Sequence, residues 1–143
     1  MLMKRWLCVC IALVMMLSFI PAVHAQQVQK EVTPALMGEL DGTLSLHGST
    51  DVAYTNKIGS TGNTNLSLYL PLADNEKMIV SYEFYDYNKK KWEPRDVRIV
   101  HGPASGFFGT LESEFEQGEF RVAVSTTSEN PKSAFYHAEF VAW

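Results

Sequence analysis

Cysteine is almost absent from this sequence: its two cysteines, Cys8 and Cys10, both lie in an apolar stretch near the N-terminus. If that stretch is removed as a leader, the remaining chain has no cysteine, which excludes disulfides and thiolate chemistry. Basic runs are equally scarce. The longest is Lys89, Lys90 and Lys91, and the formal net charge is −4 at pH 7, so the sequence argues against a nucleic-acid partner.

Long apolar runs are also lacking, with one exception near the N-terminus. Residues 1–25 combine the basic pair Lys4 and Arg5, an apolar run over residues 7–19 and a small-residue exit ending at Ala25. This order of features is typical of a secretory signal peptide. The apolar run is shorter than a membrane span requires. We therefore expect cleavage after Ala25, export to the cell envelope or the exterior, and no insertion into a membrane.

Removal of this leader leaves a chain that can form a single domain. The 118 remaining residues carry ten basic and sixteen acidic side chains, and a chain of this length can bury a core without disulfides. Residues 26–36 contain glutamines and charges without an apolar period, which indicates a flexible lead-in. We place the folded domain at residues 37–143.

Apolar residues recur at every second position from residue 40 onward, and no window sustains the spacing of an amphipathic helix. The alternating segments are residues 66–70, 78–85, 97–99, 107–116, 120–124 and 134–143, with weaker ones at 40–47 and 52–57. Turns rich in Gly, Asn, Pro and Ser separate them. The sequence predicts an all-β domain, a two-sheet antiparallel sandwich of about seven strands.

Three finer expectations follow from the same alternation. The strand over residues 78–85 is apolar on nearly both faces, so we expect it to be central. Glu112, Glu114 and Glu116 should stand on the solvated face of the strand over residues 107–116. Residues 59–64 are small and polar, which predicts a flexible loop.

The segment over residues 117–124 resembles the turn and sixth strand of fibronectin type III and related immunoglobulin-like domains. In that family a glycine turn leads into an aromatic residue followed by alternating apolar residues, here Phe120, Val122 and Val124. The strand over residues 78–87, with Trp92 after its hairpin, resembles the family's third strand. The resemblance covers about half of the exported chain and implies an immunoglobulin-like sandwich with Phe120, Val122 and Val124 at the centre of the core. The corner aromatic is Phe120 rather than tyrosine, so the family's hydroxyl-to-backbone bond cannot form.

Signatures of catalysis and metal binding are missing from the chain. His47, His101 and His137 contain no closely spaced pair of the kind that begins a zinc site, and we read them as surface or turn residues. A weak metal site remains as an alternative, because His47 and His137 lie on the first and last expected strands. The nucleophile motif Gly-x-Ser-x-Gly does not occur. We therefore expect no catalytic residue, no metal, no cofactor and no enzymatic activity.

The aromatic residues are the most suggestive group for binding. Tyr85 and Tyr87 share one face of a strand and Trp92 follows its hairpin, so these rings could stack on a sugar. Tyr54 and Tyr69 occupy less apolar segments. The alternative, favoured by the abundance of aromatics in sandwich cores, is that Trp92 is the core tryptophan and the tyrosines bridge core and water.

The hairpin tip offers a second kind of contact, because Lys89, Lys90 and Lys91 could attract an acidic protein surface. The candidate ligand-binding residues are thus Tyr85, Tyr87, Trp92, Lys89, Lys90 and Lys91, and the candidate contact loops are residues 59–63, 88–91 and 126–132. The sequence predicts a small exported, non-enzymatic β-sandwich that binds an extracellular protein or glycan. The alternative is a secreted protease inhibitor that acts through an end loop.

Overall fold

The computed structural model describes residues 37–142 apart from residue 115, and the predicted leader and lead-in lie outside that range. The strands are β1 (Met37–Leu46), β2 (Val52–Tyr54), β3 (Ile58–Leu72), β4 (Lys77–Asp86), β5 (Lys91–His101), β6 (Ala104–Leu111), β7 (Gly118–Thr126) and β8 (Lys132–Ala142). None of the described residues is helical. The prediction of an all-β domain is confirmed, with eight strands where about seven were expected.

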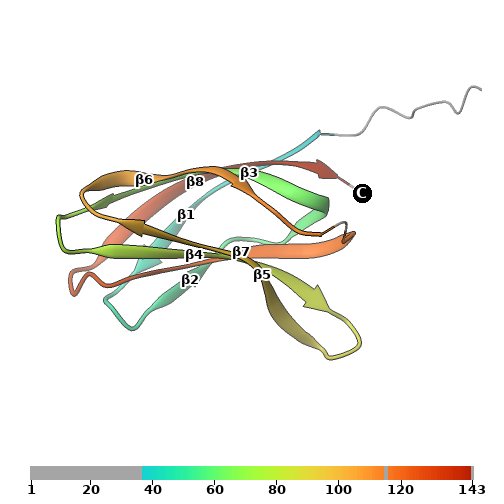
Figure 1. Cartoon of the computed structure of the whole chain (residues 1–143), viewed down its shortest axis with the longest axis horizontal. Coiled ribbons are helices and arrows are strands. Elements are labelled where there is room, and N and C mark those ends of the chain that lie inside the picture. The colour runs from blue at the N-terminus through green and yellow to red at the C-terminus, as the bar shows by residue number, and fades with distance from the viewer. Residues whose placement is uncertain (1–36, 115, 143) are drawn as a thin grey trace, which may run out of the picture. The chain divides into compact units, whose positions relative to one another are not determined.

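The strands form one antiparallel sheet in the order β1-β8-β3-β7-β4-β5, in which β2 also pairs with β7 and β6 with β3. The start of β3 pairs with β7, whereas the rest of β3 pairs with β6 and β8. The sheet therefore has two parts: the β3 group (β1, β8, β3 and β6) and the β4 group (β2, β7, β4 and β5). The two groups lie over one another, and the end of the β4–β5 hairpin projects beyond them (Figure 1).

The strand β3 changes partners at Gly62. Its register is interrupted between Ser60 and Thr64, and Gly62 has a φ of 132°, a backbone conformation that side chains disfavour. The Gly62 N–H donates to Ser60 Oγ at 3.2 Å, which satisfies this backbone group where the ladder is broken. The flexible loop predicted over residues 59–64 is therefore wrong: these residues are part of β3, and Ser60 and Thr64 are fully buried.

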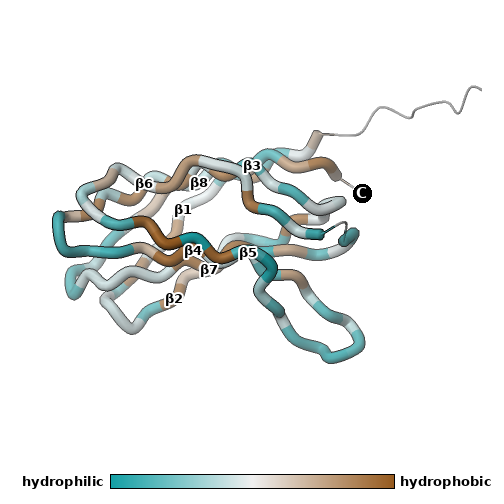
Figure 2. Tube along the Cα trace, in the orientation of Figure 1, coloured by the Kyte–Doolittle hydropathy of each residue, from teal (hydrophilic) through white to brown (hydrophobic). Residues whose placement is uncertain are grey.

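The core lies between the two groups and is filled by buried side chains of six of the eight strands, with partly buried residues of β2 and β5 packed against it. Its fully buried large side chains are Leu46, Ile58, Leu66, Leu68, Leu70, Met78, Val80, Tyr82, Leu111, Phe120, Val122 and Val124. Burial of Phe120, Val122 and Val124 confirms that this segment lies in the core. Figure 2 shows hydrophobic segments along β4 and β7, whereas the tip of the β4–β5 hairpin is hydrophilic.

The side chain of Tyr82 connects the two groups across the core. Its hydroxyl donates to the Gly62 carbonyl oxygen at 2.7 Å and accepts from Thr64 Oγ1 at 2.8 Å. Its ring stacks on Phe120, with ring centres 4.8 Å apart and planes 11° apart. Burial raises the pKa of Tyr82 to about 12, because the phenolate would lose its hydration in this position.

Most of the remaining strand predictions are confirmed, and one is wrong. β4 lies between β7 and β5, as expected of a central strand, although Ile79 on its outer side is 39% exposed. The β4–β5 hairpin and the first and last strands lie where the alternation placed them. The strand over residues 107–116 ends at Leu111 instead. The glutamates that follow lie in an irregular segment, where Glu116 is half-buried against Arg95, so they are not one strand face.

Truncation of the central core ring should be costly. We expect Phe120→Ala to lower the free energy of unfolding by about 3–5 kcal/mol, because it leaves a cavity beneath Tyr82 and Phe84. Urea denaturation monitored by circular dichroism measures this loss. Ile99→Ala, at a position 58% exposed, is the control and should change the midpoint little. Equal midpoints for the two variants would contradict the placement of Phe120.

Removal of the buried hydroxyl of Tyr82 should also destabilise the domain. Tyr82→Phe leaves the Gly62 carbonyl and the Thr64 hydroxyl without their partner, which should cost about 1–3 kcal/mol. Thr64→Val removes the second hydroxyl of the pair. The double variant should lose less stability than the sum of the two single losses in urea denaturation. Strictly additive losses would mean that the two hydroxyls do not interact.

Candidate functional site

The three predicted aromatic residues do come together, on the outer side of the β4 group. Tyr85 and Trp92 are opposite one another on β4 and β5, with ring centres 5.1 Å apart and planes at 58°. Tyr87 meets Tyr85 edge-on, at 4.9 Å and 87°. The rings are tilted and do not form one flat strip. Trp92 is half-buried on this outer side, so the expectation of a core tryptophan is wrong.

An arginine from β7 occupies the centre of this group of rings. The guanidinium carbon of Arg121 lies 4.4 Å from the centre of the Trp92 ring and 3.9 Å from that of Tyr54 on β2. Its Nε donates to Glu83 Oε2 at 2.7 Å. A cation over an aromatic face is attracted by the electrons of the ring, and the carboxylate holds the guanidinium in place. We name Tyr54, Tyr85, Tyr87, Trp92 and Arg121 the arginine–aromatic cluster.

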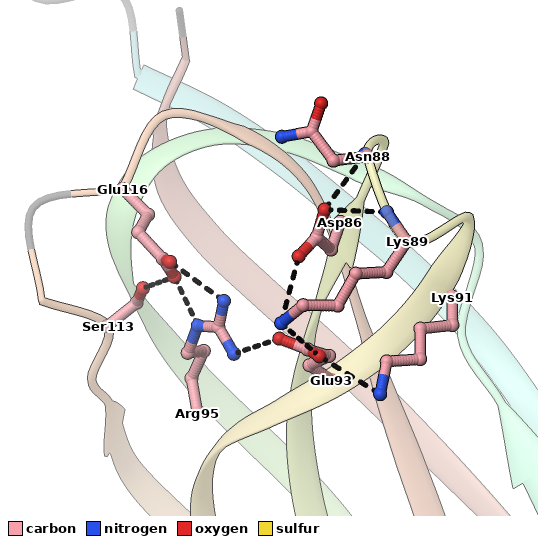
Figure 3. Close-up of polar contacts among 8 residues, drawn as sticks. All are labelled: Asp86, Asn88, Lys89, Lys91, Glu93, Arg95, Ser113 and Glu116. Carbon is pink, nitrogen blue, oxygen red and sulfur yellow. Dashed lines mark hydrogen bonds and ion pairs between the residues drawn. The ribbon is translucent and has the colours of Figure 1, made fainter.

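The predicted lysines lie at the tip of the adjoining hairpin, where Asp86 organises the turn. Asp86 Oδ1 accepts the N–H groups of Asn88 at 2.9 Å and Lys89 at 3.1 Å (Figure 3). Lys90 has a φ of 54°, in the left-handed region. These backbone bonds, above all that from Lys89, lower the pKa of Asp86, because they favour its ionised form.

Two of the three lysines are already paired with carboxylates. Lys89 Nζ lies 2.9 Å from Glu93 Oε1 and 3.3 Å from Asp86 Oδ2, and Lys91 Nζ lies 3.2 Å from Glu93 Oε1. The hydrogen bond to Glu93 is the main cause of the raised pKa of Lys89. Less positive charge is therefore available for attracting a partner than three consecutive lysines suggest.

The same ion pairs continue from the hairpin to the segment after β6. Arg95 Nη1 lies 3.4 Å from Glu93, and Arg95 Nη2 donates to Glu116 Oε1 at 2.8 Å, while its Nε bonds the other oxygen of Glu116 (Figure 3). Ser113 Oγ donates to Glu116 at 3.0 Å. An open groove of about 950 Å³ lies beside this network, lined mainly by charged side chains of β5 and residues 112–116. Most of these charges are paired with one another. We therefore interpret the ion pairs beside the groove as contacts that hold the domain together rather than as groups that bind a ligand.

The third candidate contact region, the loop over residues 126–132, is held against the domain. Lys132 Nζ lies 2.7 Å from Glu76 Oε2, and the same carboxylate accepts the Ala73 N–H at 2.8 Å. Ser128 is buried, and its Oγ accepts the Asn130 N–H at 3.3 Å. These contacts do not support an inhibitory loop that projects from the end of the domain.

The contacts of Glu76 predict a dependence of stability on pH. The hydrogen bond from Lys132 lowers the pKa of Glu76 from its ordinary 4.5 to about 2. The stabilisation is therefore fully present above about pH 4.5 and lost as the pH falls through about 2. Glu76→Gln should lower the urea midpoint at neutral pH. The difference in midpoint between the variant and the parent should disappear as the pH falls through this acidic range. Asp74→Asn in the same exposed turn is the control, and a gap independent of pH would contradict the assignment.

The other residues considered from sequence lie apart from this cluster. Tyr69 is on β3, on the outer side of the other strand group. His137 pairs with Asp41 on β1, whereas His47 lies six residues after Asp41, about 20 Å further along the strand pair. The alternative of a weak metal site shared by His47 and His137 is therefore wrong. Within the described ranges, no three side chains of His, Cys, Asp or Glu are grouped to hold a metal ion.

Sequence reasoning missed Arg121, which organises the cluster. The alternation of β7 placed Arg121 on its outer face, but its partners Glu83, Trp92 and Tyr54 come from three other strands. Only the strand register brings them together.

Between residues 37 and 142 the structure contains no helix long and apolar enough to cross a membrane.

Comparison with known proteins adds nothing to these contacts. No protein family, no curated protein and no solved structure matches the chain. Function is therefore inferred from the residues and contacts of this chain alone.

Proposed function

We propose that this chain is an exported, non-enzymatic binding module that contacts a protein through the outer face of the β4 group. The main support for the proposal is a group of five exposed apolar side chains on that face. Its members are Val52 (43% exposed), Tyr54 (48%), Ile79 (39%), Val97 (52%) and Ile99 (58%). We name these five residues the apolar patch.

The strand register places the five side chains on one face of the β4 group, with the small Ser125 of β7 between Val52 and Ile79. Ile79 lies opposite Ile99 on β5, and both Ile79 and Val52 lie opposite Ser125 on β7. Val97 is opposite Ser81 on β4, two residues along the strand from Ile79. Contiguous apolar side chains on the surface of a soluble domain commonly mark an interaction site, because water leaves them favourably when a partner binds.

The neighbourhood of the patch also favours a protein over a sugar. Tyr54 belongs both to the patch and to the arginine–aromatic cluster, so the two surfaces are continuous. Tyrosine, tryptophan and arginine are the residue types that contribute most to protein–protein binding energy. The face of Trp92 is covered by Arg121, which leaves little flat ring surface for a sugar. Among the described strands β5 pairs only with β4, so its outer edge is also open to a partner.

The finer features of the proposal rest on the sequence. Export follows from the leader pattern of residues 1–25. We interpret the β3 group and the β4 group as the two sheets of an immunoglobulin-like sandwich, joined by β3. The register break at Gly62 and the burial of both inner faces support this interpretation. Non-enzymatic binding is the function that such a domain performs through its faces and loops.

A charge placed in the apolar patch should abolish partner binding. We would immobilise the protein, capture secreted and cell-envelope proteins of the producing organism, and measure the Kd of each captured protein. The double variant Val97→Asp/Ile99→Asp should weaken binding by at least about tenfold, because two charges would be desolvated in the interface. Met37→Asp, at an exposed apolar position of β1 (64%), is the matched control.

The capture experiment has results that support the proposal and results that contradict it. A partner retained by the parent and by Met37→Asp but lost by the double variant supports the proposal. Identical captured proteins for all three, or none captured by the parent, would overturn it. Because all three positions are exposed, unchanged thermal midpoints should confirm that each variant is folded.

A further inference from the structure

A second exposed surface lies on the outer face of the β3 group, on the opposite side of the core from the apolar patch. Three aromatic side chains stand there side by side: Phe108 (50% exposed) on β6, Tyr69 (53%) on β3 and Phe135 (63%) on β8. Tyr69 is opposite Phe135, and Phe108 is opposite Ser67, two residues from Tyr69. We name these three residues the aromatic row. It crosses three strands, so it is a property of the fold and not of one segment.

Two of the three rings in the aromatic row contact one another directly. Tyr69 meets Phe108 edge-on, with ring centres 4.9 Å apart. Tyr69 and Phe135 instead both line a groove of about 450 Å³, although they are direct neighbours across β3 and β8. Both rings therefore contribute apolar surface to the wall of this groove. A ligand with an apolar face could pack against these two side chains.

Polar side chains also line this groove. His137 Nδ1 lies 2.7 Å from Asp41 Oδ1, and both residues line the groove together with Thr43. The carboxylate of Asp41 is largely exposed, at 73% of its side chain, so it can still accept hydrogen bonds from a ligand. Sites for small ligands typically combine apolar and aromatic walls with a few polar groups that fix orientation.

The rest of the outer face of the β3 group carries polar and acidic side chains. Strand alternation places Asn65, Ser67 and Thr110 beside the aromatic row, and Thr110 Oγ1 donates to Asn65 Oδ1 at 2.7 Å. Among the described residues that share this face there is no lysine or arginine, whereas Glu39, Asp41 and Glu139 are acidic. Anionic polymers would be repelled by these carboxylates, so their charge favours a neutral ligand.

We propose that the aromatic row and its groove bind a neutral polysaccharide. The C–H face of a sugar ring is apolar and would pack against Tyr69 and Phe135, while its hydroxyl groups would bond Asp41, His137 and the amide and hydroxyl side chains beside them. The site is independent of the apolar patch, because the two faces lie on opposite sides of the core. One molecule could therefore hold a polysaccharide and a protein partner at the same time.

Depletion assays with cellulose, chitin, curdlan and starch test this proposal, with alginate as the anionic comparison. We expect the protein to bind at least one of the four neutral polymers and to bind it equally at low and high ionic strength. Tyr69→Ala and Phe135→Ala should each weaken that binding by about tenfold, the loss of one aromatic contact. Tyr69→Phe keeps the ring and should retain most of the affinity.

Matched variants separate this site from the protein-binding face. Val97→Asp/Ile99→Asp should bind the polysaccharide like the parent, whereas Tyr69→Ala should bind protein partners like the parent. All the substituted positions are exposed, and thermal midpoints would verify folding. The proposal would be overturned if the protein bound none of the neutral polymers, if it bound alginate alone, or if both alanine variants bound like the parent. None of these results would contradict the proposed protein contact on the other face.

Discussion

The bonds of the Tyr82 hydroxyl fix the point at which β3 passes from one strand group to the other. This hydroxyl donates to the Gly62 carbonyl, in the backbone segment where β3 leaves β7 and turns to β6 and β8. A glycine permits the positive φ, and the break in the ladder leaves polar groups in an apolar core. Tyr82, Thr64 and Ser60 satisfy them. The two groups can therefore face one another around an apolar core.

Closure of the core in this way leaves two outer faces with different chemistry. The face of the β4 group carries aliphatic side chains beside an arginine held between aromatic rings. The face of the β3 group carries three exposed rings, hydroxyl and amide side chains, and carboxylates. Side chains on an outer face do not contribute to the core, so a group of exposed apolar side chains there is informative about function.

The residues that the sequence singled out lie together in the structure, but most of their contacts were not predicted. Tyr85, Tyr87 and Trp92 do contact one another, because a hairpin brings residues on both sides of a short turn together. Lys89 and Lys91 were expected to offer free charge, yet the turn places Asp86 and Glu93 within reach of them. The aromatic row was not foreseen, since Phe108, Tyr69 and Phe135 are far apart in the chain and meet only through strand order.

Alternation of apolar residues alone determined the all-β class, the inner residues Phe120, Val122 and Val124, and the β4–β5 hairpin, because period-two burial is a local property of a strand. The polar residues 59–64 were misread as a loop, since their burial depends on Tyr82 across the core. Strand order, the partner change at Gly62 and the composition of each outer face were decided by tertiary structure only. They arise from pairings between distant segments, and the local pattern of one strand does not specify its neighbours.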